Sequence, residues 1–141
     1  MALIGGGGAG GAGNVAGSNP AGIGSSLNYI GNHVYANSGT YEAKTSSQTV
    51  LEFTTGNNYI VGTLQLNSAV QYSNASVRQS AAKISFDSQI IALVVGSAED
   101  APVSQATDIL IPPFTNVKVE VISTHSDSDN FTTVSIVGRV Y

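Results

Sequence analysis

Few residues in this chain of 141 carry the groups that catalysis needs. His33 and His125 are the only imidazoles, and His125 lies close to Asp127 in the sequence. A Ser-His-Asp triad needs a serine, an imidazole and a carboxylate in hydrogen-bonded succession, and no motif marks one of the many serines as a nucleophile. The chain has no cysteine, which excludes a thiolate nucleophile, disulfides and thiolate metal sites. We therefore expect a protein that is not an enzyme and whose two histidines are exposed.

The acidic segment 126–130 resembles a fragment of a calcium loop. Calcium takes six to eight oxygen ligands, often from carboxylates at alternate positions. The candidate ligands are Asp127, Asp129 and Asn130, without the glycine or the distal glutamate that such a loop uses. Asp, Ser and Asn are also common in ordinary turns, because their side chains bond nearby backbone groups. We expect a plain turn and no cofactor, and leave calcium binding as the alternative.

Two further patterns have a plainer interpretation. The stretch Gly8–Gly13 matches G-x-G-x-x-G, but the dinucleotide fingerprint requires a preceding strand and a following helix, and neither is indicated. The tyrosines could form a sugar-binding platform, although Tyr35 and Tyr41 are expected to pack between strands, where aromatic residues are favoured. These six tyrosines stand at positions 29, 35, 41, 59, 72 and 141.

Composition narrows the possible partners. Charged residues make up 10% of the chain, against about 25% in a typical globular domain, and the net charge is −4. The five cationic residues are scattered, so direct binding of nucleic acid, which needs clustered Lys and Arg, is not expected. The longest apolar run, Ile90–Val95, is far shorter than the roughly 20 residues that cross a bilayer, so no membrane partner is expected. The start, Met1–Ile4, does not resemble a signal peptide. A surface so poor in charge favours a chain that other chains cover.

Apolar residues alternate with polar ones over much of residues 27–141, which is the signature of half-buried strands. Val117, Val119 and Val121 show it most clearly, with Lys118 and Glu120 between them. The alternation and the turn signals predict an all-β domain, an antiparallel β-sandwich of about eight strands with a jelly-roll-like topology. The expected strands are 33–43, 49–54, 59–70, 80–86, 89–96, 107–111, 116–124 and 131–141.

Turn signals separate these strands. Asp87-Ser88 is a candidate tight turn, and Pro112-Pro113 should end the strand before it. The run 89–95 is apolar at successive positions, which favours a central strand or one whose outer face a partner covers. Residues 74–80 could form one helical turn, and 97–105 another helical turn or a loop.

Residues 1–26 differ from the rest of the chain and are expected to form an extended arm. Ten of the sixteen glycines lie within the first 24 residues. Ordering those 24 residues costs on the order of 25–50 kcal/mol. Burying each apolar side chain returns only about 1.5–3 kcal/mol, so backbone hydrogen bonds to a neighbouring surface would be needed. Fully extended, the arm could reach about 80 Å. Its apolar anchors for partner binding are Met1, Leu3, Ile4, Val15 and Ile23.

Three parts of the sequence together resemble the small virion proteins of tailed bacteriophages, including capsid decoration, or cement, proteins. These parts are the Met1–Gly6 start with its glycine arm, the segment Ile109–Thr115 and the ending Val134–Tyr141. The resemblance implies a homo-oligomer, with a trimer favoured, on the capsid surface of the virion. It implies major capsid protein or other virion subunits as partners, and no catalytic residues.

The sequence thus predicts a structural protein that binds and stabilises a phage capsid shell through its β-domain and its arm. Alternatives are a tail, collar or fibre component of the virion, and a carbohydrate-binding attachment module.

Overall fold

The computed structural model describes residues 27–70, 78–98, 103–125 and 130–141. The predicted arm, residues 1–26, lies outside this part of the chain. No helix of membrane-spanning length and apolarity occurs in the described residues.

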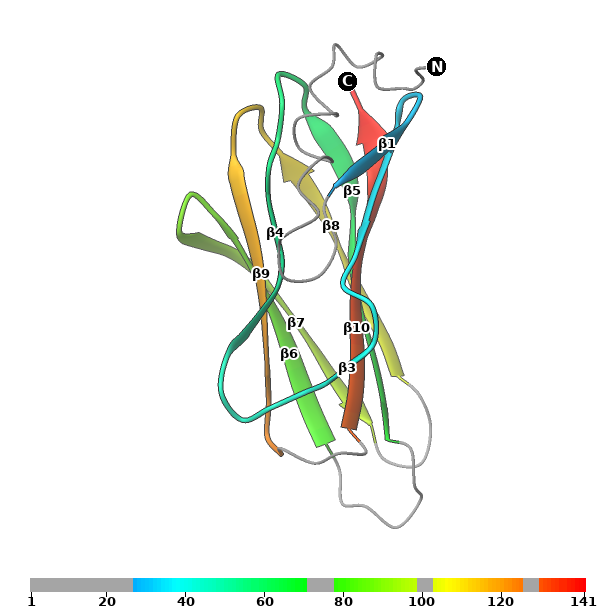
Figure 1. Cartoon of the computed structure of the whole chain (residues 1–141), viewed down its shortest axis with the longest axis vertical. Coiled ribbons are helices and arrows are strands. Elements are labelled where there is room, and N and C mark those ends of the chain that lie inside the picture. The colour runs from blue at the N-terminus through cyan, green and yellow to red at the C-terminus, as the bar shows by residue number, and fades with distance from the viewer. Residues whose placement is uncertain (1–26, 71–77, 99–102, 126–129) are drawn as a thin grey trace.

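Strands make up most of the domain, and they form two sheets that lie face to face (Figure 1). The ten strands are β1 (Asn28–Ile30), β2 (His33–Asn37), β3 (Tyr41–Glu42), β4 (Gln48–Thr54), β5 (Ile60–Val70), β6 (Arg78–Phe86), β7 (Gln89–Ala98), β8 (Val103–Ile111), β9 (Asn116–Ser123) and β10 (Asn130–Val140).

The strand order confirms the predicted jelly-roll-like sandwich. The first sheet has the order β1-β2-β10-β5-β8, with β3 also paired to β10, and the second has the order β4-β9-β6-β7. Every pairing is antiparallel. From β4 onwards, successive strands alternate between the sheets, except for the hairpin β6–β7. Such crossing over is the antiparallel double-sheet arrangement of jelly rolls.

The core lies between the sheets and follows the period-2 alternation of the sequence. Val117, Val119 and Val121 of β9 are fully buried, as are Leu64 and Leu66 of β5. Other members of this core are Leu27, Val34, Leu51, Phe53, Ile60, Ile84, Val94, Ile109, Ile111, Val134, Ile136 and Val140. Because these apolar side chains come from both sheets, their burial holds the sheets together.

The predicted strand 33–43 is wrong in its middle. β2 ends at Asn37, and Gly39 adopts a positive φ of 70° before β3 begins. The Asn37 Oδ1 atom accepts a hydrogen bond from the Gly39 amide at 2.7 Å, which fixes the bend. The short strand β1, which pairs with β2, was not predicted.

The predicted helical turns are wrong where the structure describes them. β7 continues through Ala98 and β8 begins at Val103, so most of 97–105 is strand. Arg78–Ser80 likewise belongs to β6, while 74–77 lies outside the described residues. Long-range pairing to the neighbouring strands outweighs the weak local helix signals.

The predicted tight turn at Asp87-Ser88 is confirmed. Both residues have positive φ, 48° and 73°, and Phe86 pairs with Gln89. Two positive φ values are the mark of a type I′ hairpin turn, which usually contains Asn or Gly. Here the Asp87 carboxylate accepts a hydrogen bond from the Asn116 amide at 2.9 Å, so a contact with β9 supports an otherwise unfavourable turn. The hairpin projects at the left of Figure 1, beyond β9.

Candidate interaction surface

The outer face of β7 carries large aliphatic side chains that are about half exposed. Ile91, Leu93 and Val95 are 50%, 59% and 48% exposed, while Val94 between them points into the core and is 5% exposed. The apolar run noted in the sequence is therefore apolar on both faces of the strand. Fully burying a side chain of this kind stabilises a complex by about 1.5–3 kcal/mol. Covering this face with a partner would therefore contribute substantially to the free energy of binding.

A β-bulge adds one more aliphatic residue to this face. The pairing of β6 with β7 shifts between Ile84 and Ser85, because Ile84 lies opposite Ala92 whereas Ser85 lies opposite Ile90. Ile91 is thus the extra residue, and Ile90 next to it is 59% exposed. The bulge turns two successive isoleucines toward solvent instead of one.

Neighbouring strands widen the apolar surface. In the register of the second sheet, Val95 lies opposite Ala81 of β6, and Ala81 lies opposite Ile122 of β9. Ile122 is 44% exposed. We call the set of Ala81, Ile90, Ile91, Leu93, Val95 and Ile122 the β7 patch.

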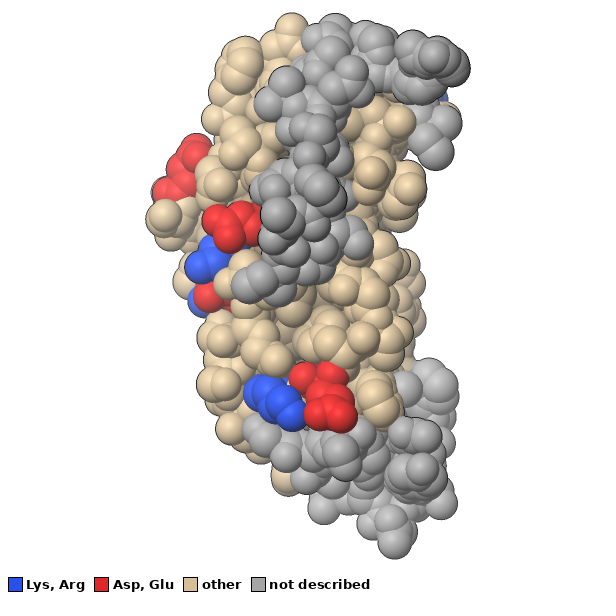
Figure 2. All heavy atoms as spheres, viewed as in Figure 1, with Lys and Arg blue, Asp and Glu red and all other residues tan. Residues whose placement is uncertain are grey.

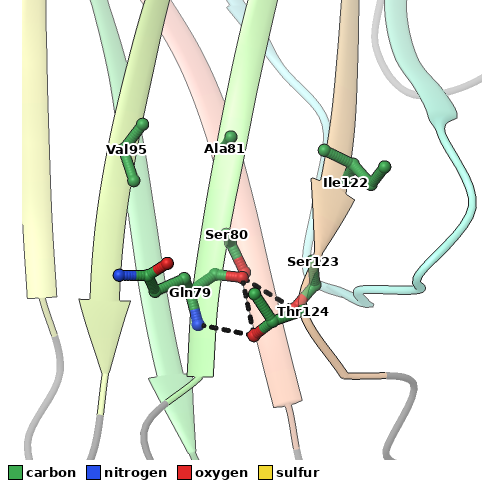
Figure 3. A pocket seen from close by; sticks show the side chains of 7 residues that line it. All are labelled: Gln79, Ser80, Ala81, Val95, Ile122, Ser123 and Thr124. Carbon is green, nitrogen blue, oxygen red and sulfur yellow. Dashed lines mark hydrogen bonds between the residues drawn. The ribbon is translucent and has the colours of Figure 1, made fainter.

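A shallow pocket of about 330 Å³ opens at one end of the β7 patch (Figure 3). Val95, Ala81 and Ile122 contribute its apolar lining, and Gln79 and Thr124 contribute polar groups. The Gln79 amide donates to Thr124 Oγ1 at 3.1 Å, and the Thr124 amide donates to the Gln79 carbonyl at 2.9 Å. These bonds engage the backbone groups that line the pocket and leave a mainly aliphatic hollow.

The charges beside the β7 patch are paired with one another. Lys83 lies opposite Leu93 on one side and Glu120 on the other. The Lys83 Nζ atom is 3.0 Å from Glu120 Oε2, and Lys118 Nζ is 3.7 Å from Glu120 Oε1. The hydrogen bond from Lys83 is the main reason why the pKa of Glu120 is lowered. A partner of strong opposite charge is therefore not what this surface favours.

Charged groups are sparse over the rest of the visible surface as well. In Figure 2 the Lys, Arg, Asp and Glu side chains form a few separate groups on one face, and most of the described surface in that view is uncharged. This agrees with the 10% of charged residues in the sequence.

The metal-ligand candidates are not brought together by the described structure. Asp127 and Asp129 lie outside it. Asn130 begins β10 and is fully buried, and its Nδ2 atom donates to Ser123 Oγ at 2.8 Å, which links the two sheets. Within the described ranges, no group of three or more His, Asp or Glu side chains is placed to hold a metal ion.

The two histidines lie at opposite ends of β10. His33 pairs with Arg139, near the end of that strand, and is exposed. His125 is half-buried close to the start of β10, so the expectation that it is exposed is wrong, and its Nδ1 atom lies 3.0 Å from Thr124 Oγ1. Asp127, the third member of the triad considered from sequence, is outside the described residues.

The tyrosines divide into two groups. Tyr29 and Tyr41 pack against the core, and burial raises the pKa of both phenols. The expectation that Tyr35 packs between strands is wrong, because it lies on the outer face of the first sheet and is 44% exposed. Tyr59 and Tyr141 are also exposed, and their backbones exchange two hydrogen bonds of 3.1 and 3.0 Å. Tyr72 lies outside the described residues.

The predicted arm anchors, Met1, Leu3, Ile4, Val15 and Ile23, all lie outside the described residues. What the sequence did signal is the run 89–95. The contributions of Ala81 and Ile122 could not be read from it, because only the register of the second sheet places them beside Val95.

Comparisons with known proteins give a fold-level likeness only. No protein-family model matches the chain, and no curated protein matches it. Among solved structures, it is similar to a chain of the T13 particle of infectious bursal disease virus, with 9% sequence identity and a TM-score of 0.49, over 82% of this chain. A chain from the Gx strain of that virus is similar at 10% identity and a TM-score of 0.44, over 80% of this chain. The match spans about a third of each of those chains, 33% and 35%.

Proposed function

We propose that this chain is a structural virion protein that binds and stabilises a phage capsid shell, as a decoration or cement protein. The observation that carries the proposal is a charge-poor jelly roll with an uncovered aliphatic surface, attached to a glycine-rich segment of residues 1–26 that contains no charged side chain. Both features suit a protein whose work is to make contacts with other subunits, and neither supplies reactive groups.

The two parts have different tasks in this proposal. The β-domain sits on the outside of the shell, and the arm extends across neighbouring subunits of the major capsid protein. Glycine lets the backbone of the arm approach another backbone closely, so the arm can add to a sheet edge by main-chain hydrogen bonds. Met1, Leu3, Ile4, Val15 and Ile23 would anchor it in apolar hollows. Linked contacts reinforce one another, and the added contact area resists internal pressure.

Arm variants test this proposal in the full-length protein. We expect Leu3→Ser with Ile4→Ser to weaken binding to decoration-free shells of the encoding virus at least tenfold, measured by co-sedimentation, because two anchors are lost. The matched control is Ala9→Ser with Ala12→Ser, which changes two arm residues that are not anchors and should bind normally. Removal of residues 1–24 should abolish binding. Unchanged binding after that truncation would contradict the proposal that the arm binds the shell.

The position in the particle is a separate question. A tail, collar or fibre component would have the same need for subunit contacts. Electron microscopy of virions labelled on this chain distinguishes the two, since a decoration protein covers the shell and a tail component does not. The sequence resemblance implies a trimer, whereas the edge pairing inferred below gives a dimer, and the mass of the protein in solution distinguishes the two.

A carbohydrate-binding attachment module is a second candidate. The observation that favours it is the set of exposed aromatic side chains Tyr59, Phe114 and Tyr141, which are 49%, 73% and 68% exposed. Aromatic rings are suitable platforms for sugar rings. A glycan array on which the protein binds no sugar would remove this candidate.

A further inference from the structure

We propose that the free edge of β7 pairs with β7 of a second copy of this chain, antiparallel and about a twofold axis. The result is a continuous eight-stranded sheet made from two four-stranded ones. This inference does not rest on the proposed function, because the same pairing would occur in any protein with this edge.

The free edge of β7 is suited to one kind of partner. Among the described strands, β7 is the last of its sheet and is hydrogen-bonded only to β6. The backbone N–H and C=O groups on its other side point away from the sheet. Another extended strand can form hydrogen bonds with this row of groups. The occupant is therefore a β-strand, not a helix or a small molecule.

β7 is also the least protected of the sheet edges. Natural proteins blunt free edges with charges, proline, bulges or very short strands. β1 has 3 residues, β4 carries the exposed Glu52 and an irregular register, and β8 carries the exposed Asp108. β7 has 10 residues without a charge or a proline, and its bulge at Ile91 leaves Ala92–Ala98 regular. A long edge strand without charges or proline is expected where a protein uses that edge to pair with another chain.

β7 of a second copy of this chain matches that edge. Pairing about a twofold axis perpendicular to the sheet keeps the outer faces of both copies on one side. Centred on Val94, it places Leu93 opposite Val95 of the second copy, and Val95 opposite Leu93 of that copy. Directly opposed aliphatic residues stabilise antiparallel strands, and a twofold contact uses the same surface on both sides. The surface is complementary to itself, since it carries no charge that a copy would repel.

Residues on the neighbouring strands extend the apolar contact between the two copies. The row Val95–Ala81–Ile122 of one copy runs on into Leu93 of the other, and beyond it into the Lys83–Glu120 ion pair. The β7 patches of the two copies thus merge into one apolar area at the twofold axis. The paired charges of each copy stay at its rim, where they remain solvated.

Lysine variants of the full-length chain test the pairing. We expect the wild-type protein to sediment as a dimer in analytical ultracentrifugation, and Leu93→Lys or Val95→Lys to raise the dissociation constant at least 100-fold. In a dimer of either variant, the two introduced lysines would lie close to the twofold axis and repel each other. The matched control is Val137→Lys, because Val137 of β10 is 58% exposed on the outer face of the first sheet. A monomeric or trimeric wild-type protein, or equal weakening by Val137→Lys, overturns the inference.

Cysteine cross-linking tests the register. The chain contains no cysteine, so any disulfide that forms must involve the introduced thiols. A mixture of the Leu93→Cys and Val95→Cys proteins should form a disulfide-linked heterodimer under mild oxidation, in at least fivefold excess over either protein alone. Cross-linking that is equal in all three samples would contradict pairing about Val94. Binding to capsid shells is measured separately: a dimer that binds no shells defeats the proposed function alone, and a shell-binding monomer defeats this inference alone.

Discussion

β9 and β7 belong to the same sheet and face the same core, yet their outer faces differ, because charged residues precede the exposed Ile122 on β9 whereas β7 is aliphatic from Ile91 to Val95. β9 presents Lys118 and Glu120 to solvent, and both take part in ion pairs. β7 presents Ile91, Leu93 and Val95, which are about half exposed. The inner faces of both strands are apolar. The two strands therefore differ not in how they build the domain but in what their outer faces are available to do.

The difference follows from their places in the sheet. β9 lies between β4 and β6, so both of its edges are hydrogen-bonded within the domain. β7 has one free edge among the described strands, and the aliphatic residues on its outer face stay about half exposed. The comparison teaches that exposed aliphatic side chains on an unpaired edge indicate contact between subunits, whereas the same side chains on the inner face indicate the core.

The largest expected difference between the two strands is the loss of stability when a valine is truncated to alanine. Val119→Ala on the buried face of β9 should lower the free energy of unfolding by about 2 kcal/mol, because it removes buried surface and leaves a cavity. Val95→Ala on the exposed face of β7 should change it by no more than about 0.5 kcal/mol. Urea denaturation at a concentration where the chain is monomeric measures both. Equal losses would mean that the outer face of β7 packs within its own domain.

An intermediate effect is expected at the turn that leads into β7. Ser88 has a φ of 73°, a conformation that costs less for glycine than for other residues. Ser88→Gly should therefore raise the free energy of unfolding by roughly 0.5–1 kcal/mol, because relief of about 1–2 kcal/mol of backbone strain exceeds the extra entropy that glycine loses on folding. The control is Asp87→Gly, which removes the acceptor for the Asn116 amide and should give a smaller gain or a loss. Thermal denaturation of both variants tests this, and a destabilised Ser88→Gly protein would contradict it.

The smallest effect concerns the charges on β9. The pKa of Glu120 is lowered below 4.5 in the folded protein, chiefly by its hydrogen bond with Lys83. A lowered carboxyl pKa stabilises the fold above the unfolded pKa, and this contribution disappears as the pH falls through the folded pKa. Glu120→Gln should thus cost about 0.2–1 kcal/mol at pH 7 and progressively less as the pH falls through the folded pKa of Glu120. Denaturation of both proteins over a series of acidic pH values gives the difference, and a cost that does not change with pH would assign it to packing.

Local sequence patterns predicted the regular parts of the fold well and the irregular parts poorly. The alternation in β9 and β10 located both strands, and Pro112 was rightly expected to end β8 at Ile111. The break between β2 and β3 was missed, because a single glycine with a positive φ decides it. Residues 97 and 98 were expected in a helical turn or a loop, although they continue β7, because pairing with β6 leaves little trace in local propensity.

The sequence by itself determined the all-β class, the near absence of charge and the apolar character of β7. These are properties of composition and of short-range periodicity, which burial and strand geometry translate directly into structure. Only the tertiary structure decided that β7 is an edge strand and not a central one, and that Ala81 and Ile122 join its outer face. Strand order depends on the free energy of all the pairings together, so no single stretch of the chain encodes it.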